Sequence, residues 1–70
     1  MEMFGCNSSN IARYGYDPKE RIMGVEFRRG GLYHYKDVPH EVFNAFLEAP
    51  SKGSFHYQQI KGNYDWEKVS

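Results

Sequence analysis

The sequence predicts an α+β fold in which a three-stranded antiparallel β-meander is followed by two helices packed on one face. Three observations lead to this prediction. Apolar and polar residues alternate along residues 21–29, the pattern of a half-buried strand. Two glycines separate this segment from a second alternating one, and an apolar stripe at helical spacing follows. Strands that precede helices, rather than alternating with them, indicate helices on one face of an antiparallel sheet.

The first two strands are expected on either side of a turn. Residues 8–17 form the first strand, and Asp17 and Pro18 suit the first two positions of a β-turn. The second strand directs its apolar side chains to one face, and these are Met23, Val25 and Phe27. This face of the sheet is therefore the candidate core face.

A hairpin leads into the third strand. Gly30 and Gly31 predict a two-residue turn, because both tolerate positive φ. The returning strand, residues 32–37, directs Tyr33 and Tyr35 to one face. Two parallel phenol rings could form a platform on which nucleic-acid bases stack, or they could fill the core. The core interpretation is favoured, because the opposite orientation would bury a histidine and a lysine.

The first helix is expected to begin at Pro39, which suits the first helical position, and to end at Pro50. Its apolar stripe consists of Val42, Phe43, Phe46 and Leu47. The stripe predicts the helix face that packs on the sheet.

A shorter second helix is expected next. Ser51 or Ser54 could cap its start, and Gly62 suits the C′ position after its end. Phe55 and Ile60 would face inward. The tail after this helix contains Tyr64 and Trp66, which we expect to fold back onto the domain.

The chain of 70 residues is long enough for one domain. We expect residues 1–7 to be a loose lead-in, residues 8–66 to form the domain, and residues 67–70 to be a tail. The chain has six Tyr, five Phe and one Trp. Each such ring buries roughly 150–250 Å², so the core needs most of them.

Composition restricts the function classes. Nine basic and nine acidic residues cancel, so the chain is not a strongly cationic nucleic-acid binder. A single cysteine, Cys6, leaves no internal disulfide. No apolar run reaches the length of a membrane span, and no signal peptide is apparent. These features predict a cytoplasmic protein.

No enzyme signature is found. The three histidines are spread over a predicted strand and two predicted helices, and they are His34, His40 and His56. No two of them have the i, i+4 spacing of metal ligands on one helix. Cys6 has no base or oxyanion donor nearby in the sequence. We therefore predict no catalytic residue, no metal site and no cofactor.

Basic residues form two groups, one near the central hairpin and one around the second helix. They are Arg13, Arg28, Arg29, Lys36, Lys52 and Lys61. If they converge in the fold, they could follow the phosphates of a nucleic acid. The alternative is that they keep a small surface hydrated together with the acidic residues between them.

The segments "SSNI…GYD", "VEF…GG…YHY…VP" and "SKGSF…IKGNY" together resemble the KTSC domain. This is a stand-alone bacterial and phage domain that is also found at the C-terminus of some lysyl-tRNA synthetases. The resemblance runs from Ser8 to Tyr64. Tyr14 departs from the family, which has an aliphatic residue there, and could enlarge the core or mark a separate binding surface.

The resemblance implies a small non-catalytic accessory domain that binds RNA, with tRNA as a candidate, because of its attachment to a tRNA synthetase. Ser8, Asn10 and Ser51 could form a shared polar site for a phosphate, or they could tie the first strand to the second helix. The alternative function is a protein–protein module that uses an exposed sheet edge or the tail around Tyr64 and Trp66. Such a module could be a homodimer or a phage-encoded factor that docks on a host protein.

Overall fold

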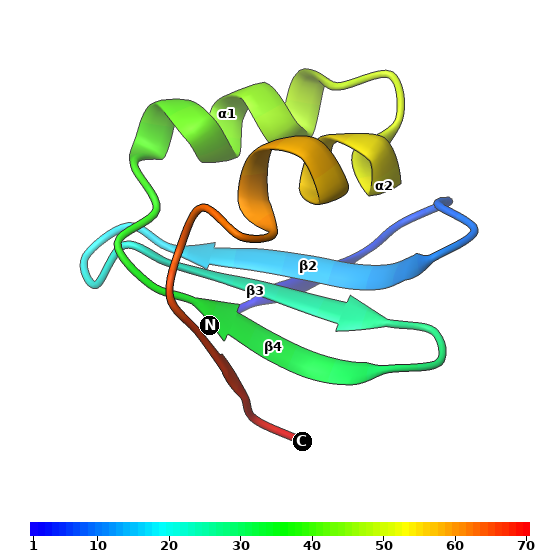
Figure 1. Cartoon of the computed structure of the whole chain (residues 1–70), viewed down its shortest axis with the longest axis horizontal. Helices are drawn as coiled ribbons and strands as arrows, with labels where there is room; N and C mark the ends of the chain where they lie inside the picture. Colours follow the sequence, from blue (N-terminus) through cyan, green and yellow to red (C-terminus); the bar gives the residue numbers. More distant parts are fainter.

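The structure, a computed structural model that describes residues 1–70, contains one antiparallel sheet with its helices on one face (Figure 1). The five strands lie in chain order, so each pairs with its neighbour in sequence. The elements are β1 (Met3–Gly5), β2 (Ile11–Asp17), β3 (Ile22–Phe27), β4 (Gly31–Tyr35), α1 (His40–Glu48), α2 (Lys52–Phe55), the π-helical turn η1 (His56–Ile60) and β5 (Trp66–Lys68). The predicted α+β class is confirmed.

The predicted count of three strands is wrong, because each end of the chain adds an edge strand. β1 pairs with β2, with Met3 opposite Gly15, and β5 pairs with β4, with Trp66 opposite Tyr35. Each edge strand has only three residues, too few for an alternating pattern to be recognised in the sequence. β1 lies in the segment expected as a lead-in, and β5 runs into the segment expected as a tail.

The hairpin between β3 and β4 turns through residues 28–30 rather than through the predicted Gly30-Gly31 pair. Gly31 already lies in β4, opposite Phe27, with a φ of 88°. A Cβ at this position would overlap the carbonyl oxygen of Ser70. Glycine is therefore required here by the left-handed backbone and by the close approach of the chain's last residue.

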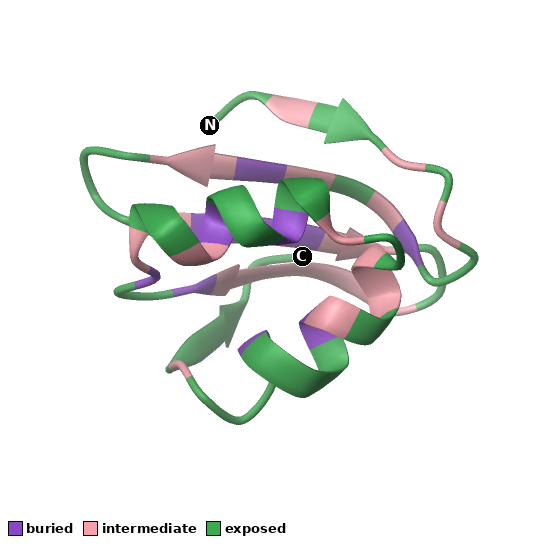
Figure 2. Ribbon diagram, turned by 90° about the horizontal axis from the view of Figure 1, so that it is seen from above, coloured by how far each residue is buried: buried purple, intermediate pink, exposed green.

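The core lies between the helices and the covered face of the sheet (Figure 2). Its buried apolar residues are Ile11, Met23, Val25, Tyr35, Val38, Phe43, Phe46 and Ile60. Met23 and Val25 are fully buried and Phe27 packs against the core cluster, which confirms that these three side chains share the core face. Gly24, on the other face, is also buried, because the side chains of Met1 and Met3 lie over it.

An irregular register in β2 decides where Tyr14 points. The pairing of β2 with β3 shifts between Ile11 and Arg13. A β-bulge there lets Ile11 and Tyr14, three residues apart, face the same side of the sheet. The Tyr14 ring packs edge-on against Phe46, with 5.3 Å between the ring centroids. Tyr14 therefore enlarges the core.

Helix α1 packs two aromatic rings onto the sheet. It begins at His40, so Pro39 is the N-cap residue and not, as predicted, the first residue of the helix. Phe43 and Phe46 are buried as predicted, but Leu47 is 40 % exposed. Leu47 lies at the border of the apolar stripe, so its inclusion in the core was wrong.

The predicted second helix is divided into α2 and the π-helical turn η1, and it starts at Ser51, one of the two caps that the sequence offered. Ser51 is the N-cap, and its Oγ accepts a hydrogen bond from the Ser54 amide over 3.2 Å. The helix continues as η1, where the Lys61 amide donates to the His56 carbonyl over 2.8 Å. Gly62 follows with a φ of 84°. The Ser51 cap and the C′ position of Gly62 are confirmed.

The other face of the sheet carries no helix (Figure 1). Side chains of Met1 and Met3 lie across Gly15 and Gly24, whose missing side chains leave room for them. The two faces thus differ in kind, one covered by helices and one open.

No helix of the chain combines the length and the apolar character needed to cross a membrane.

Candidate functional site

Two neighbouring hollows share Asn10 and Tyr57. The larger one, the polar hollow, has a volume of about 740 Å³ and lies between residues 5–10 and residues 50–54, with Tyr14, Tyr57 and Gln58 completing its lining. The smaller one, the aromatic groove, has a volume of about 330 Å³. It is lined by Asn10, Phe27, Gly30, Tyr33, Tyr35, His56, Tyr57, Lys61 and Trp66.

Two serines build the walls of the polar hollow. Ser8 Oγ accepts hydrogen bonds from the amides of Asn10 and Ile11, each over 3.1 Å. Ser51 Oγ accepts one from the Ser54 amide. Each serine oxygen thereby orders a turn, and because it accepts in these bonds, its hydroxyl hydrogen can still be donated to a ligand.

Gly53 brings the two walls together. A Cβ built on Gly53 would lie 3.4 Å from Ser8 Oγ and 4.0 Å from the Asn10 Cβ. The loop before β2 therefore lies next to the first turn of α2, separated from it by about the space that a methyl group at position 53 would fill. Ser8, Asn10 and Ser51, which the sequence suggested as one polar site, all line the same hollow.

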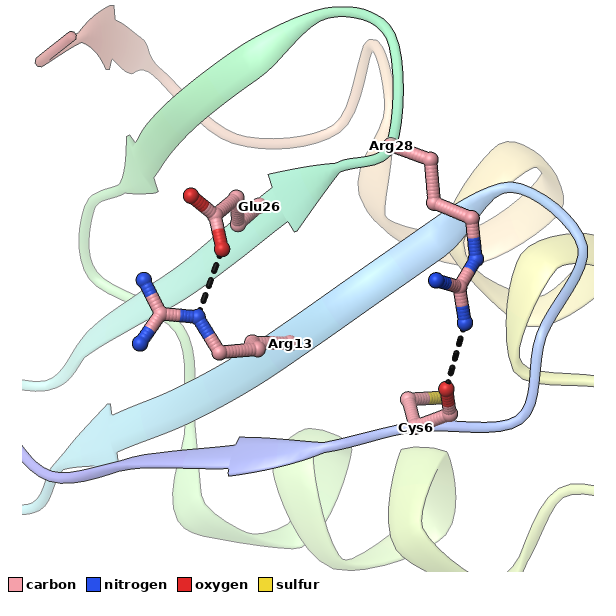
Figure 3. Close-up of polar contacts among 4 residues, drawn as sticks. All are labelled: Cys6, Arg13, Glu26 and Arg28. Atoms are coloured by element: carbon pink, nitrogen blue, oxygen red, sulfur yellow. Dashed lines mark hydrogen bonds and ion pairs between the residues drawn. The ribbon is translucent and has the colours of Figure 1, made fainter.

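Arg28 fastens the β1–β2 loop to the β3–β4 hairpin. Its Nε donates to the Ser8 carbonyl over 2.9 Å, and its Nη2 donates to the Cys6 carbonyl over 2.8 Å (Figure 3). Neither partner is an anion, so the positive charge of Arg28 is not neutralised. It remains beside the polar hollow.

Tyr35 and His56 form the floor of the aromatic groove. Both are buried, with 4 % and 5 % exposure, and Tyr35 Oη lies 2.8 Å from His56 Nε2. Burial, with a smaller contribution from Tyr33, raises the pKa of Tyr35 to about 12. Burial, with a smaller contribution from Lys61, lowers the pKa of His56 to about 4. Both side chains are therefore neutral near pH 7.

The tyrosine pair of β4 belongs to the core, as the sequence favoured. Tyr35 is buried, and Tyr33 is half-buried and packed against the core cluster. The outer side of Tyr33 meets Trp66, with ring centroids 5.3 Å apart. The pair itself is therefore not an exposed stacking platform.

The rims of the groove carry the exposed aromatic rings. Tyr57 is 68 % exposed and Trp66 is 58 % exposed. Lys61 Nζ lies 5.3 Å from the centroid of the Tyr57 ring. Largely exposed aromatic rings and a nearby cation are groups on which unpaired nucleic-acid bases can stack.

The six predicted basic residues do not form one face. Arg13 Nε pairs with Glu26 Oε1 over 2.6 Å (Figure 3), and Lys36 Nζ lies 4.0 Å from Glu67 Oε1. Hydrogen bonding to Arg13 lowers the pKa of the Glu26 carboxyl. By strand alternation, Arg13 and Lys36 lie on the open face of the sheet.

The remaining basic residues lie towards the helices or at the hairpin. Lys52 lines the polar hollow and Lys61 lines the aromatic groove. Lys52 Nζ donates to the Leu47 carbonyl over 3.0 Å, so it also closes the end of α1. Arg29 is exposed in the β3–β4 turn. The fold therefore separates Arg13 and Lys36, on the open face, from Lys52 and Lys61, at the hollows.

Acidic residues are absent from both hollows. The chain has nine Asp and Glu residues, and none of them lines the polar hollow or the aromatic groove. The neutral overall charge thus hides an uneven distribution, with cations and hydrogen-bond donors gathered where no carboxylate lies.

The two predicted interface residues, Tyr64 and Trp66, differ in how far they are exposed. Trp66 lies on the edge strand β5 and is largely exposed, whereas Tyr64 is half-buried and packs against the core. Both also line a third hollow, of about 620 Å³, with Lys36 and Asp65. Trp66 alone has the exposure of an interface residue.

Sequence reasoning missed Tyr57 and His56 as site residues. Both lie in η1, whose π-helical turn follows neither the 3.6-residue nor the two-residue period. His56 could have been found as a polar residue next to the predicted inward position Phe55. Tyr57 carries no comparable signal.

The fold is that of a small α+β domain, in which an antiparallel meander is covered by two helices. The surface where the β1–β2 loop meets α2 has no acidic residue among its lining side chains. The chain belongs to the KTSC domain family, whose family model matches residues 7–64. This match confirms the resemblance noted in the sequence.

Known relatives agree with this assignment. The crystal structure of a KTSC domain protein from Yersinia pestis matches with a TM-score of 0.96 at 36 % identity, over 99 % of this chain and 97 % of that chain. An uncharacterized protein of Stutzerimonas stutzeri is 45 % identical over 60 residues, covering 86 % of this chain and 83 % of the relative. A lysine–tRNA ligase of Nostoc sp. is 37 % identical over 62 residues, covering 89 % of this chain but only 11 % of the ligase.

Proposed function

We propose that this KTSC domain is a non-catalytic accessory module of the cytoplasm that binds structured RNA, with tRNA as the first candidate. The observation that carries the proposal is the acid-free surface formed by the polar hollow and the aromatic groove. A phosphate backbone is repelled by carboxylates and attracted by Lys and Arg. In a chain of zero formal net charge, this surface is the one suited to RNA.

Four basic side chains are assigned to phosphates. Lys52 and Lys61 line the two hollows, and Arg28 and Arg29 lie in the hairpin whose Gly30 also lines the groove. Arg13 and Lys36, by contrast, have carboxylate partners on the open face. They are not part of the proposed surface.

The relatives add support from context. Segments similar to this chain make up 11 % of the lysine–tRNA ligases of Nostoc sp. and Trichormus variabilis. The name of these enzymes makes tRNA their substrate, so a small accessory segment in them could help to hold that RNA. The same surface in a separate chain would serve the same purpose.

The proposal is tested by fluorescence-anisotropy titration of labelled tRNA at several salt concentrations. The four assigned phosphate contacts predict that log K falls with log salt with a slope of about −2.8, which is about −0.7 for each contact. An affinity that is insensitive to salt would contradict the proposal. So would the absence of binding at low salt, where electrostatic attraction is strongest.

A second candidate function is a protein–protein module. The observation in its favour is that both edge strands expose a large aromatic ring, Phe4 on β1 at 49 % and Trp66 on β5 at 58 %. Exposed edges can pair with a strand of another chain, whether a second copy or a host protein bound by a phage-encoded factor. A solution mass that rises with concentration would indicate self-association.

A further inference from the structure

We propose that the aromatic groove binds one unpaired nucleobase of an RNA strand, and that the phosphate next to this base lies in the polar hollow. This inference rests on the proposed RNA-binding function and makes it specific. It names what the groove holds, which part of RNA that is, and how the two hollows work together.

The size of the groove matches a single flat ring system. Its volume of about 330 Å³ is close to the lower end of about 300–1,000 Å³ for ligand pockets. A base pair held in a duplex could not enter such a hollow. A base in a loop or at a strand end could, because unstacked bases can be turned outward.

The walls offer aromatic faces for stacking. Trp66 contacts Tyr33 on one side, with 5.3 Å between centroids, and yet remains 58 % exposed. Tyr57 also lines the groove, is 68 % exposed and has the Lys61 ammonium over its ring. Stacking on such rings strengthens binding by roughly 5- to 150-fold per base.

Polar groups at the floor and rim suit the edge of a base. His56 lines the groove, and because Nε2 is held by Tyr35, its Nδ1 is the ring's second polar atom. Asn10 lines the groove at its border with the polar hollow. An Asn amide can donate to and accept from the edge of a base. The groove therefore offers hydrogen bonds as well as stacking.

The connection to a phosphate follows from the shared border. Asn10 and Tyr57 line both hollows, so a nucleotide whose base lies in the groove extends directly into the polar hollow. There it meets the hydroxyl groups of Ser8 and Ser51 and the cation of Lys52, with no carboxylate among the lining residues. Base and phosphate each find a matching environment.

The experiment uses the fluorescence of Trp66, the only tryptophan of the chain. A short single-stranded RNA, the same strand annealed to its complement, and tRNA are titrated into the full chain. We expect the single strand and tRNA to change the Trp66 emission and the duplex to leave it unchanged. Equal binding and equal emission changes for duplex and single strand would overturn the inference.

Variants separate the inference from the proposed function. Trp66→Leu and, independently, Tyr57→Ala should weaken binding of the single strand by about 5-fold or more, in anisotropy titrations. Phe4→Leu is the matched control, since Phe4 is exposed on the opposite edge and lines neither hollow. Circular dichroism establishes that each variant is folded. If Trp66→Leu does not fold, Tyr57→Ala decides.

The possible failures are distinguishable. If RNA binds with the predicted salt dependence but Trp66→Leu and Tyr57→Ala bind as tightly as the wild type, the groove assignment is wrong and the proposed function stands. If no RNA binds at low salt, both are wrong. If the chain binds a protein and no RNA, both the groove assignment and the proposed function are wrong.

Discussion

Tyr35 and His56 are each other's hydrogen-bond partner in a region from which water is almost excluded. Because burial penalises charge, the phenol resists losing its proton and the imidazole resists gaining one. The pair is thus neutral across the physiological range. A neutral floor leaves the charge of the groove to Lys61 and suits an uncharged base.

The stability of the fold should depend on the protonation of His56. Its pKa is about 6.5 in the unfolded chain and about 4 in the folded one. Between these values the unfolded state binds a proton that the folded state does not. The free energy of unfolding is therefore unaffected by the protonation of His56 above pH 6.5. It falls by up to about 3 kcal/mol as the pH is lowered towards 4.

Urea unfolding of the wild type and His56→Gln over this pH range checks the expectation. The stability advantage of the wild type over His56→Gln should shrink as the pH is lowered. His40→Gln, at an exposed position, is the control and should follow the wild type. Parallel pH profiles for the wild type and His56→Gln would refute the assignment.

Short elements at the chain ends complete the sheet. β5 holds one edge, and the residues after it approach β4 so closely that Leu32 exchanges backbone hydrogen bonds with Ser70 and Val69, at 3.0 and 2.7 Å. Gly31 permits this approach. The groove depends on it, because β5 carries Trp66.

Three glycine variants separate backbone strain from close contact. Gly62→Ala has open space but a positive φ, so it should cost about 1 kcal/mol of unfolding free energy. Gly31→Ala should cost more, since it adds the overlap with Ser70. Gly5→Ala has neither problem and is the control. Thermal or urea unfolding gives all three values, and equal losses at Gly31 and Gly62 would contradict the role of the last residue.

The sequence predicts the elements with a clear period. Alternation placed β3 and β4, and the Ser51 cap and Gly62 marked the second helix. Three-residue strands carry no recognisable period, so β1 and β5 could not be predicted. The residues of η1 were predicted as helical, but their π-helical geometry was not. Ser8, Asn10 and Ser51 could be suggested as neighbours, but Tyr57 could not.

At the scale of the whole molecule, charge is distributed by the fold rather than by the composition. The sequence could group Arg13 and Lys36 with Lys52 and Lys61, because it does not reveal strand facing or acidic partners. In the structure the first two lie on the open face near carboxylates, and the other two lie at the acid-free hollows. A neutral chain thus has a surface without carboxylates, which is the surface proposed to bind RNA.

Charge reversal on the two faces tests this central claim most directly. The double variant Lys52→Glu/Lys61→Glu changes the acid-free surface, and Lys19→Glu/Lys36→Glu introduces the same charge change at the β2–β3 turn and the open face. Affinity for labelled tRNA is measured by fluorescence anisotropy at low salt. We predict that the first variant binds much more weakly and that its salt slope is reduced by about 1.4, whereas the second stays close to the wild type. Equal losses in the two variants would show that RNA is attracted by total charge, and would contradict the assignment of the surface.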